Sequence, residues 1–404
     1  MMKRKDYSVT EEMVRAVEEA VTLLRQNPGL VSTAAQIMDK GMRMVSGELF
    51  GNPRIKAGVF PGQRELSSVR RDACGLMELG EAWTAFMRRT VDRRKSASNA
   101  LDEAFYIMMD RVRCVEEGVI LRQVKSLILS YQPEYLTRLN GFYAKLGYMW
   151  GALDTKANIY QVVENRIRVM AEHWAEMERV YERLADYRSR KVLYHTLSSW
   201  LTYDWADLTA MYENNFEAYW DLDLIKCSEE EVIVDLGAYT GDSVQAYIDT
   251  YGAWKRIYAY EMMEDNFRQM QENLRAYENI VMSRKAVAQK PGVMYIDDGI
   301  NFTDAHRLAD SGRNAVEVTT LDEDISEKIT LIKLDIEGAE RDALLGARRH
   351  IQEEKPKLLI SVYHNNEDIW RIPGMLLEMR EDYRLYLRSN GRQYGPVDMV
   401  LFAV

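Results

Sequence analysis

An acid and two glycines follow a short apolar segment in the second half of the chain. Residues 231–248 read EVIVDLGAYTGDSVQAYI, in which Asp235 ends the apolar run and Gly237 and Gly241 precede a helical pattern. Glycine permits tight turns and close approach of a ligand at the carboxyl end of a strand. The spacing matches neither G-x-G-x-x-G nor a loop ending in G-K-S/T. By itself the loop therefore suits several cofactors, or packing alone.

Two carboxylates narrow the choice of ligand. Asp235 would repel a pyrophosphate and suits a ligand that carries an amino group and a sulfonium. Glu261 ends the next apolar segment, RIYAYE. It comes about 20 residues after the loop, where an acid accepts hydrogen bonds from ribose hydroxyls. The alternative for Glu261 is a solvated acid in the first turn of the following helix.

A second group of reactive side chains follows two later apolar segments. Asp335 and Glu337 come after ITLIKL, and His364 comes after KLLISVY. Converging at the mouth of a parallel sheet, they would form an acid–base cluster able to deprotonate a hydroxyl. The alternatives are a helix N-cap for Asp335, first-turn acids for Glu337 and Glu340, and a structural role for His364. Asp335 with Glu337 could also bind Mg²⁺, but no third ligand is evident, and we predict no metal site.

Five segments of this region share their motifs with one protein family. They are VDLGAYTGDSV, IYAYEMMEDNF, VTTLDEDI, LIKLDIEGAERDALLGA and LLISVYHNNEDIWRIP. These motifs resemble the FkbM family of S-adenosylmethionine-dependent methyltransferases, over roughly residues 180–404, and K-x-D-I-E-G-x-E is the most specific of them. The resemblance implies methyl transfer from S-adenosylmethionine to a hydroxyl of a sugar or a secondary metabolite.

The resemblance also assigns roles to individual residues. It implies that the methionine end of the cofactor is held by Asp235, Gly237, Ala238, Tyr239 and Gly241, with Asp242 and Ser243 at the start of the next helix. It implies that Glu261 binds the ribose, that Met262 packs on the adenine, and that Lys285 and Ala286 lie at the adenine edge.

One position departs from the family pattern. An Arg-His pair is expected after the segment LYLR, but Ser389 and Asn390 stand there instead. If the histidine takes part in the chemistry or holds the acceptor, this chain has lost or replaced it.

Short β-branched segments alternate with helical ones from residue 226 onward, which predicts βαβ units and a parallel sheet. The last two strands are separated by a short loop with Gly and Pro, which predicts an antiparallel hairpin. The expected fold is therefore α/β, a class I (Rossmann-like) methyltransferase sheet with an antiparallel C-terminal hairpin, preceded by an all-α N-terminal domain. We predict an all-helical domain over residues 1–175 and a methyltransferase domain over 176–404, with a helical lead-in over 176–228.

The first 225 residues are rich in helix-forming side chains and lack alternating patterns. A capping box at Ser8–Glu11 and the sequence Asn27-Pro28-Gly29 bound the first predicted helix. Further helices are predicted over 31–48, 66–92, 96–129 and 133–150, with a loop over 51–62. Apolar residues in a heptad pattern predict a long helix over about 155–187, which packs either within the chain or in a homodimer.

Composition excludes several classes of protein. The chain has 404 residues and a net charge of −10. Residues 1–225 balance 31 basic against 31 acidic side chains, so that the excess negative charge belongs entirely to the rest. Such an acidic half disfavours a nucleic-acid substrate. No segment has the length and apolarity of a membrane span or a signal peptide. Three separated cysteines favour the cytoplasm.

These observations together favour an O-methyltransferase that acts on a sugar, glycan or glycoconjugate. Two alternatives stay open. The fold could be a catalytically weak or inactive scaffold whose helical domain binds a protein partner, or the acceptor could be a protein side chain or a small metabolite.

Overall fold

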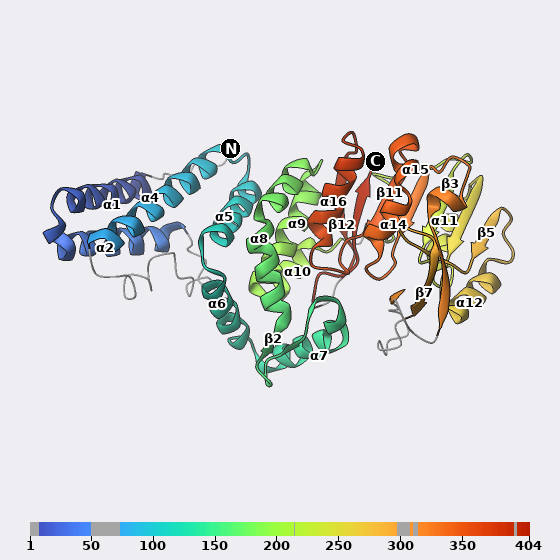
Figure 1. Ribbon diagram of the computed structural model, residues 1–404, viewed down its shortest axis with the longest axis horizontal. Helices are drawn as coiled ribbons and strands as arrows, with labels where there is room; N and C mark the ends of the chain where they lie inside the picture. Colours follow the sequence, from blue (N-terminus) through green and yellow to red (C-terminus); the bar gives the residue numbers. More distant parts are fainter. Residues whose placement is uncertain (1–7, 50–72, 214, 297–307, 310–313, 392–393) are drawn as a thin grey trace. The chain divides into compact units, whose positions relative to one another are not determined.

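The computed structural model describes residues 8–49, 73–213, 215–296, 308–309, 314–391 and 394–404 (Figure 1). The chain divides into two compact units. The helical unit comprises Met1–Arg138, Thr155–Glu178 and Trp200–Thr202. The sheet unit comprises Leu139–Asp154, Arg179–Ser199 and Tyr203–Val404. None of the helices among the described residues combines the length and the apolar character that crossing a membrane requires.

The first half of the chain is mainly helical (Figure 1). Its helices are α1 (Ser8–Gln26), η1 (Pro28–Leu30), α2 (Val31–Leu49), α4 (Ala73–Ser96), α5 (Ala100–Cys114), α6 (Glu117–Leu129), α7 (Pro133–Trp150), α8 (Gln161–Arg183), α9 (Tyr187–Thr202) and α10 (Trp205–Met211), with two-residue strands β1 (Leu153–Asp154) and β2 (Ile159–Tyr160). Helices α1, α2 and α4 share one apolar core that includes Leu24, Met38 and Trp83. The Asn27 side chain accepts a hydrogen bond from the Gly29 amide and ends the first helix.

Local signals predicted most of these helices. The helices predicted from residue 8 to residue 26, over 31–48 and over 133–150 are confirmed by α1, α2 and α7. The predicted loop over 51–62 and the start of the helix over 66–92 lie outside the described residues. The single helix predicted over 96–129 is wrong, because Val115 takes extended backbone angles (φ −106°, ψ 132°) between α5 and α6. Burial of the Val115 side chain outweighs the helical preference of the flanking residues.

The heptad pattern lies on α8, which begins later than predicted because β1 and β2 precede it. Non-helical backbone angles at His173 interrupt the helix. The heptad side chains Ile167, Met170, Met177 and Tyr181 are buried within a single chain. Their burial favours packing within the chain, the first of the two predicted alternatives.

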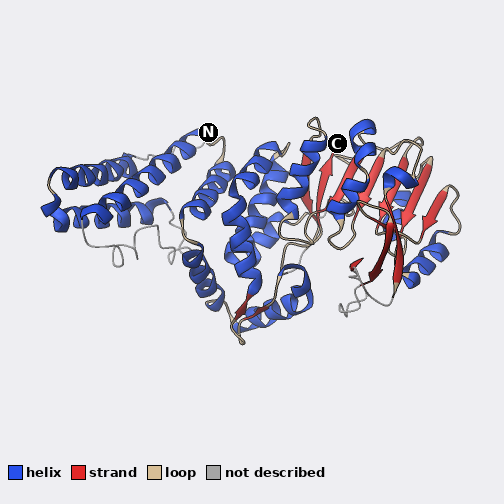
Figure 2. Ribbon diagram, in the orientation of Figure 1, coloured by secondary structure: helices blue, strands red, loops and turns tan. Residues whose placement is uncertain are grey.

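The sheet unit is built on a seven-stranded sheet (Figure 2). Its strands, in spatial order, are β12 (Leu385–Ser389), β13 (Met399–Ala403), β11 (Lys357–Ser361), β10 (Leu331–Leu334), β3 (Val232–Leu236), β4 (Arg256–Tyr260) and β5 (Ile280–Ser283). The pairs from β11 through β5 are parallel, whereas β13 pairs antiparallel with both β11 and β12. The predicted sheet with an antiparallel C-terminal hairpin is confirmed, and with it the class I methyltransferase fold.

Helices connect the strands of the sheet unit, with α13 following β9 (Ala315–Thr319) of a second, smaller sheet. They are α11 (Asp242–Tyr251), α12 (Glu264–Leu274), α13 (Leu321–Asp324), α14 (Glu340–Gly346), α15 (Arg348–Glu354) and α16 (Asp368–Met379). All residues of β3 and β10 are buried, because these central strands are covered on both faces. Because β3, β4 and β10 run parallel, their carboxyl ends lie at the same edge of the sheet.

Two segments that were expected to continue the alternation of strands and helices, Gly292–Ile296 and Ala315–Thr319, lie outside the main sheet. Strands β6 (Ala286–Val287), β7 (Gly292–Ile296), β8 (Leu308–Ala309) and β9 (Ala315–Thr319) form a separate sheet in the order β6-β9-β7-β8. Here β7 pairs antiparallel with β9, and the side chains of Ala286, Val316 and Val318 form a small core. This small sheet begins directly after β5 and contributes part of the wall of the cavity at the strand ends.

Candidate active site

A cavity of about 560 Å³ lies at the carboxyl ends of β3, β4 and β10. Most of the side chains predicted to bind a cofactor or to act in catalysis line it: Gly237, Tyr239, Asp242, Ser243, Glu261, Met262, Lys285, Ala286, Asp335 and Glu337. Asp235, Ala238, Gly241 and His364 do not line the cavity. The fold thus brings together residues that are up to 100 positions apart, as expected for strand ends of a doubly wound sheet.

The loop after β3 turns tightly and lies against the end of β10. Gly237 has a left-handed backbone (φ +75°), and a Cβ atom at this position would lie 1.9 Å from the carbonyl oxygen of Asp335. Its amide donates to the carbonyl oxygen of Tyr260 (3.1 Å). Gly241 is also left-handed (φ +86°), and a Cβ there would touch the side chain of Leu274 at 3.0 Å. Both glycines are therefore needed for the loop to approach its neighbours.

Glu261 is held by the loop that it faces. Its Oε2 accepts the amide hydrogen of Tyr239 (3.0 Å), and its Oε1 accepts that of Met263 (2.7 Å). Burial raises the pKa of Glu261, and these two amides oppose that rise. Glu261 is only 7% exposed, so it is not a solvated acid in a first helical turn. Its carboxylate is instead fixed at the wall of the cavity.

Asp235 lies behind the cavity wall, where it forms a buried ion pair. Its Oδ1 is 2.9 Å from Nζ of Lys333, and its Oδ2 accepts a hydrogen bond from the Ser243 hydroxyl. Lys333 also donates to the carbonyl oxygen of Gly237 (2.9 Å). Burial lowers the pKa of Lys333, but Asp235 and Asp335 outweigh it and raise the pKa above its usual value. Asp235 thus holds the glycine loop in place, and its charge is already balanced.

Sequence reasoning missed Lys333. A signal was present, because Lys333 and Asp335 are two positions apart at the end of a strand, where alternate side chains share a face. A lysine in the middle of a buried strand also requires an acidic partner.

Asp335 faces the cavity and is held from two sides. Its Oδ2 accepts a hydrogen bond from the hydroxyl of Tyr219 (2.8 Å), and Ser361 Oγ lies 2.9 Å from the same hydroxyl. Its Oδ1 lies 3.5 Å from Nε2 of His364. Burial alone would raise the pKa of Asp335, but His364 and Lys333 outweigh it and hold the pKa below its usual value. Asp335 is therefore an anion at neutral pH.

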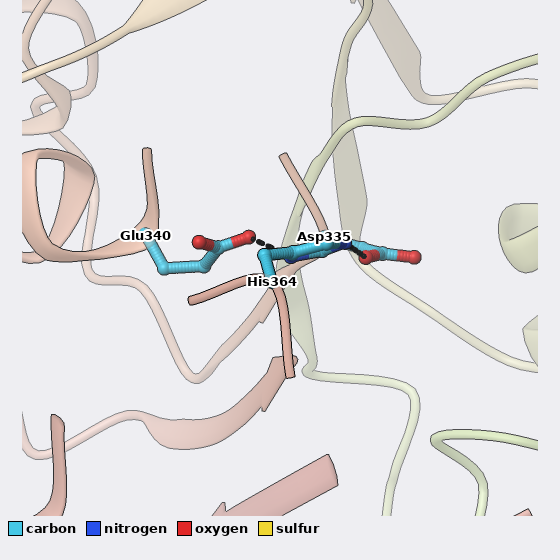
Figure 3. Close-up of side chains that lie close together, drawn as sticks. All are labelled: Asp335, Glu340 and His364. Carbon is cyan, nitrogen blue, oxygen red and sulfur yellow. Dashed lines mark hydrogen bonds and ion pairs between the residues drawn. The ribbon is translucent and has the colours of Figure 1, made fainter. Parts of the chain in front are cut away.

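His364 is completely buried between carboxylates (Figure 3). Its Nδ1 is 2.8 Å from Oε1 of Glu340, and its Nε2 is 3.7 Å from Oε1 of Glu337 as well as close to Asp335. Burial lowers the pKa of His364, but Glu340, Asp335 and Glu337 outweigh it and raise the pKa to about 10. A histidine that is already protonated cannot accept a proton, so Asp335 and Glu337 are the better candidates for the base.

Among the described residues, Asp335, Glu340 and His364 are close enough to share a metal ion. Figure 3 shows the imidazole ring between the two acids, with a different carboxylate at each nitrogen. One ion can bind only one ring nitrogen, so this order suits a row of hydrogen bonds better than a metal centre. The absence of a metal site stays a prediction.

Comparison with known proteins relates this region to one protein family. Residues 235–394 match the model of the Methyltransferase FkbM domain. The crystal structure of an FkbM methyltransferase from Methylobacillus flagellatus is 27% identical with a TM-score of 0.51, and the match covers 59% of this chain and 62% of that protein. Residues 235–394 form an FkbM methyltransferase domain.

Other solved structures are more distant. Fibrillarin from Aeropyrum pernix with bound S-adenosylmethionine is 13% identical, with a TM-score of 0.29 over 45% of this chain and 70% of that one. An rRNA methylase from Streptococcus thermophilus is 15% identical, with a TM-score of 0.30 over 44% of this chain and 87% of that one. No curated protein matches the chain. The present chain spans less than two thirds of the Methylobacillus protein.

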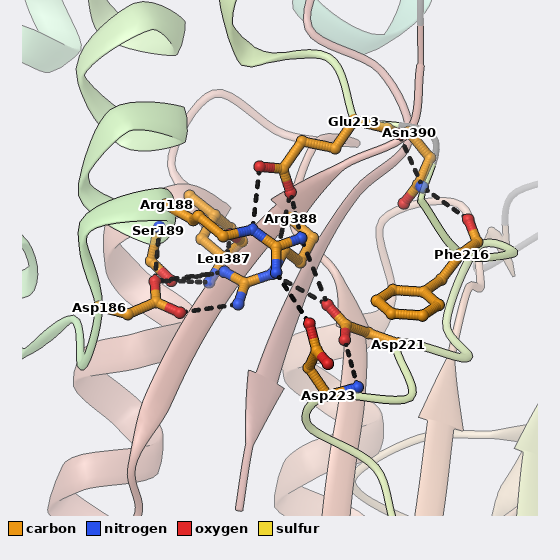
Figure 4. Close-up of polar contacts among 10 residues, drawn as sticks. All are labelled: Asp186, Arg188, Ser189, Glu213, Phe216, Asp221, Asp223, Leu387, Arg388 and Asn390. Atoms are coloured by element: carbon orange, nitrogen blue, oxygen red, sulfur yellow. Dashed lines mark hydrogen bonds and ion pairs between the residues drawn. The ribbon is translucent and has the colours of Figure 1, made fainter.

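Tyr219 contributes to the site from outside the FkbM domain. The segment that carries it is anchored to β12 by Asn390, whose side chain donates to the carbonyl oxygens of Glu213 (3.1 Å) and Phe216 (3.3 Å) (Figure 4). Asn390, which stands where a histidine was expected from the sequence, therefore holds the backbone that leads to Tyr219. The sequence carried no signal for this contact, because it joins positions more than 170 residues apart.

Arg388 secures the same segment from inside the fold (Figure 4). Its guanidinium is 2.7 Å from Asp186 and 3.0 Å from Asp221, and it also donates to the hydroxyl of Ser189 (2.9 Å). The Arg388 side chain is 4% exposed. One buried cation thus joins the start of α9, the segment that carries Tyr219 and the strand β12.

We expect Arg388→Met to lower the free energy of unfolding by about 3 kcal/mol, the lower end for breaking a buried ion pair, because Arg188 still lies 3.8 Å from the buried Asp221 and Asp186 is partly exposed. Urea denaturation of the whole chain measures this loss. The control is Arg384→Met, because Arg384 is exposed and lies just before the same strand. The control should change stability by less than about 1 kcal/mol. Equal losses of unfolding free energy in the two variants would show that the buried contacts of Arg388 contribute no more to stability than an exposed arginine does.

We expect Gly237→Ala to destabilise the protein more than Gly252→Ala. Both glycines are left-handed, with φ of +75° and +71°, so each alanine carries the same backbone cost of about 1–2 kcal/mol. Only at Gly237 does the new Cβ meet a backbone oxygen, which adds about 1–3 kcal/mol or more, whereas Gly252 has open space. Urea denaturation of both variants compares the losses, and a larger loss at Gly252 contradicts the structure.

The raised pKa of His364 predicts a specific pH dependence of stability. Its folded pKa is about 10, against about 6.5 when unfolded. The stability that it contributes is complete below pH of about 6.5 and is lost as the pH rises through the folded pKa. The difference in unfolding free energy between the wild type and His364→Gln should shrink by about 1.4 kcal/mol per pH unit in this window. Urea denaturation of both proteins at several pH values between the unfolded and the folded pKa measures this difference. A difference that stays constant with pH refutes the prediction.

Proposed function

We propose that this chain is an S-adenosylmethionine-dependent O-methyltransferase that methylates a hydroxyl of a sugar, glycan or glycoconjugate. The observation that carries the proposal is the cavity of the FkbM domain, where a fixed acid at the end of β4 and two acids at the end of β10 face the same space. The first acid suits the ribose of the donor, and the other two suit an acceptor hydroxyl.

The residues present fit the donor. A volume of about 560 Å³ lies within the range of roughly 300–1,000 Å³ typical of sites for small molecules. Glu261, Asp335 and Glu337 give the cavity a negative charge that favours a ligand with a sulfonium and an amino group. The clash that any Cβ at Gly237 would make explains why the loop has no side chain there.

Each part of the donor has residues to hold it. Glu261 accepts hydrogen bonds from the ribose hydroxyls, while Met262, Lys285 and Ala286 border the adenine. The loop after β3 takes the methionine end through Gly237, Tyr239, Asp242 and Ser243. Asp235, Ala238 and Gly241 act from behind the wall, since they shape the loop without lining the cavity.

S-adenosylmethionine supplies a methyl group on a sulfonium, so that transfer breaks a C–S bond, forms a C–O bond and releases a thioether and one proton. Asp335 and Glu337 are positioned to take that proton from the hydroxyl, a role worth about 10²–10⁴-fold in rate. Asp335 is kept ionised by His364 and Lys333. Both carboxylates accept hydrogen bonds, which orients neighbouring hydroxyls of a sugar better than an apolar metabolite.

The cytoplasm is part of the same proposal, since cysteine usage favours a reducing compartment. Among the described residues, neither Cys74 nor Cys227 is joined in a disulfide. Acceptors made in the cytoplasm, such as nucleotide sugars and glycolipid precursors, are therefore the first to test.

Calorimetric titration of S-adenosylmethionine and S-adenosylhomocysteine into the whole chain tests donor binding. We expect micromolar affinity for the wild type. Glu261→Gln should weaken it by at least about 10-fold, because a hydrogen bond to a charged group contributes about 1.5–3 kcal/mol. The control Glu272→Gln alters an acid that is 59% exposed on α12 and should leave the affinity within about 2-fold.

Absence of binding by the folded wild type would overturn the proposed function. With binding established, transfer of a labelled methyl group to nucleotide sugars and glycolipids is compared with transfer to peptides and small hydroxylated metabolites. Methylation of peptides or metabolites alone would refute the sugar acceptor while leaving the methyltransferase in place.

A further inference from the structure

One carboxylate oxygen of Glu340 lies within hydrogen-bonding distance of three N–H groups. Its Oε1 accepts the amide hydrogens of Ile336 (3.1 Å) and Gly338 (3.3 Å), and it lies 2.8 Å from Nδ1 of His364. Glu340 is fully buried and does not line the cavity. It therefore connects the acid-bearing loop after β10 to the histidine after β11, without any access to a substrate.

The contacts of His364 determine where its protons lie. A carboxylate is an acceptor only, so the short contact with Glu340 requires a proton on Nδ1. The opposite nitrogen, Nε2, faces the carboxylates of Asp335 and Glu337 at 3.5 and 3.7 Å, which are acceptors as well. Nδ1 therefore donates to Glu340. Nε2 makes no hydrogen bond among the described residues, but the two carboxylates beside it favour a proton there electrostatically, so that the ring is an imidazolium (Figure 3).

The groups around the ring reinforce this charge. Glu340 faces it from α14, and Asp335 and Glu337 face it from the loop after β10. Asp368 at the start of α16 and Asp398 before β13 also feel its charge. Two further neighbours are phenols: Tyr363 lies beside the ring, and Tyr219 reaches Asp335. The nearby cations lie on the far sides of these acids, with Lys333 against Asp335 and Arg341 against Asp368.

We propose that Glu340 is a positioning residue that keeps His364 doubly protonated, so that Asp335 meets the acceptor hydroxyl as an anion in one orientation. This inference rests on the proposed function, and it assigns separate roles to the residues of the cluster. Asp335, with Glu337 beside it, touches the acceptor and takes its proton. His364 supplies a fixed positive charge behind Asp335, and Glu340 fixes the ring and its protons.

The pKa values agree with this geometry. The carboxylates, Glu340 foremost, outweigh burial and raise the pKa of His364 to about 10, while His364 helps to hold the pKa of Asp335 below its usual value. Asp368 shows the opposite effect, although Arg341 lies 3.4 Å from it. Burial and then the charge of Glu340 raise its pKa to about 6.

The chain contains its own matched control. His350 is also buried, and its Nδ1 lies 2.7 Å from Oε2 of Glu354, one helical turn away on α15. This pair has the same acid–imidazole contact but lies away from the cavity lining. Glu340→Gln and Glu354→Gln therefore make the same chemical change at two histidines, of which one faces Asp335.

The experiment is NMR of the histidine ring nitrogens in the whole chain between pH 6 and 9. The chain has five histidines, and His364→Gln identifies the signals of His364. In the wild type, the His364 ring should stay doubly protonated across this range. In Glu340→Gln, its titration midpoint should fall by about 1–3 pH units, as expected when an adjacent opposite charge is removed. Glu354→Gln should move the His350 signals and leave those of His364 in place.

A neutral His364 ring in the wild type at pH 7 overturns the inference, and that measurement needs no variant. A His364 ring that stays doubly protonated up to pH 9 in Glu340→Gln, as in the wild type, overturns it as well. If Glu340→Gln does not fold, Asp335→Asn replaces it, and a lower midpoint in that variant is again expected. Calorimetric titration of S-adenosylmethionine runs in parallel and should give the same affinity for Glu340→Gln as for the wild type. Absence of S-adenosylmethionine binding by the wild type would overturn the proposed function. The NMR result tests the role of Glu340 whether or not the cofactor binds.

Discussion

The buried ion pair between Lys333 and Asp235 is the constraint on which the rest of the site depends. The two residues are partners across β10 and β3, and both are almost completely removed from solvent. A buried ammonium requires a paired charge and hydrogen-bond acceptors, which Asp235 and the carbonyl oxygen of Gly237 provide. The pair therefore ties the glycine loop to the two central strands. It also neutralises Asp235, which does not line the cavity, so that the negative charge of the cavity comes from the acids of its lining, which include Glu261, Asp335 and Glu337.

Asp335 shows how the remaining contacts are arranged around this pair. One of its oxygens is held by Tyr219, and the other faces the imidazolium of His364. A hydrogen bond on one side and a positive charge on the other limit the freedom of the carboxylate, which suits a site whose task is mainly to align its reactants. His364 lies between Asp335 at the cavity and the fully buried Glu340, so the contacts of Asp335 continue into the interior of the sheet unit.

Part of the first half of the chain belongs to the same unit as the cavity. Residues 139–154 and 179–199 fall within the sheet unit. The indole of Trp150 donates to the carbonyl oxygen of Tyr363 (2.7 Å), the residue before His364. Arg388 and Asn390 hold the segment that leads to Tyr219. Some of the residues that precede the FkbM domain therefore serve to position side chains within its active site.

The sequence by itself determined the features that depend on neighbouring residues. Alternating strand and helix segments specified the sheet and its hairpin, and most of the residues predicted at strand ends line one cavity, because parallel strands bring their carboxyl ends to the same edge. Folding settled which of these residues face the cavity and which face one another. Asp235 meets Lys333 across 98 positions, Tyr219 meets Asp335 across 116, and Glu340 acts on a histidine 24 positions away. Burial and distance set the charges of these groups, and neither quantity exists before the chain has folded.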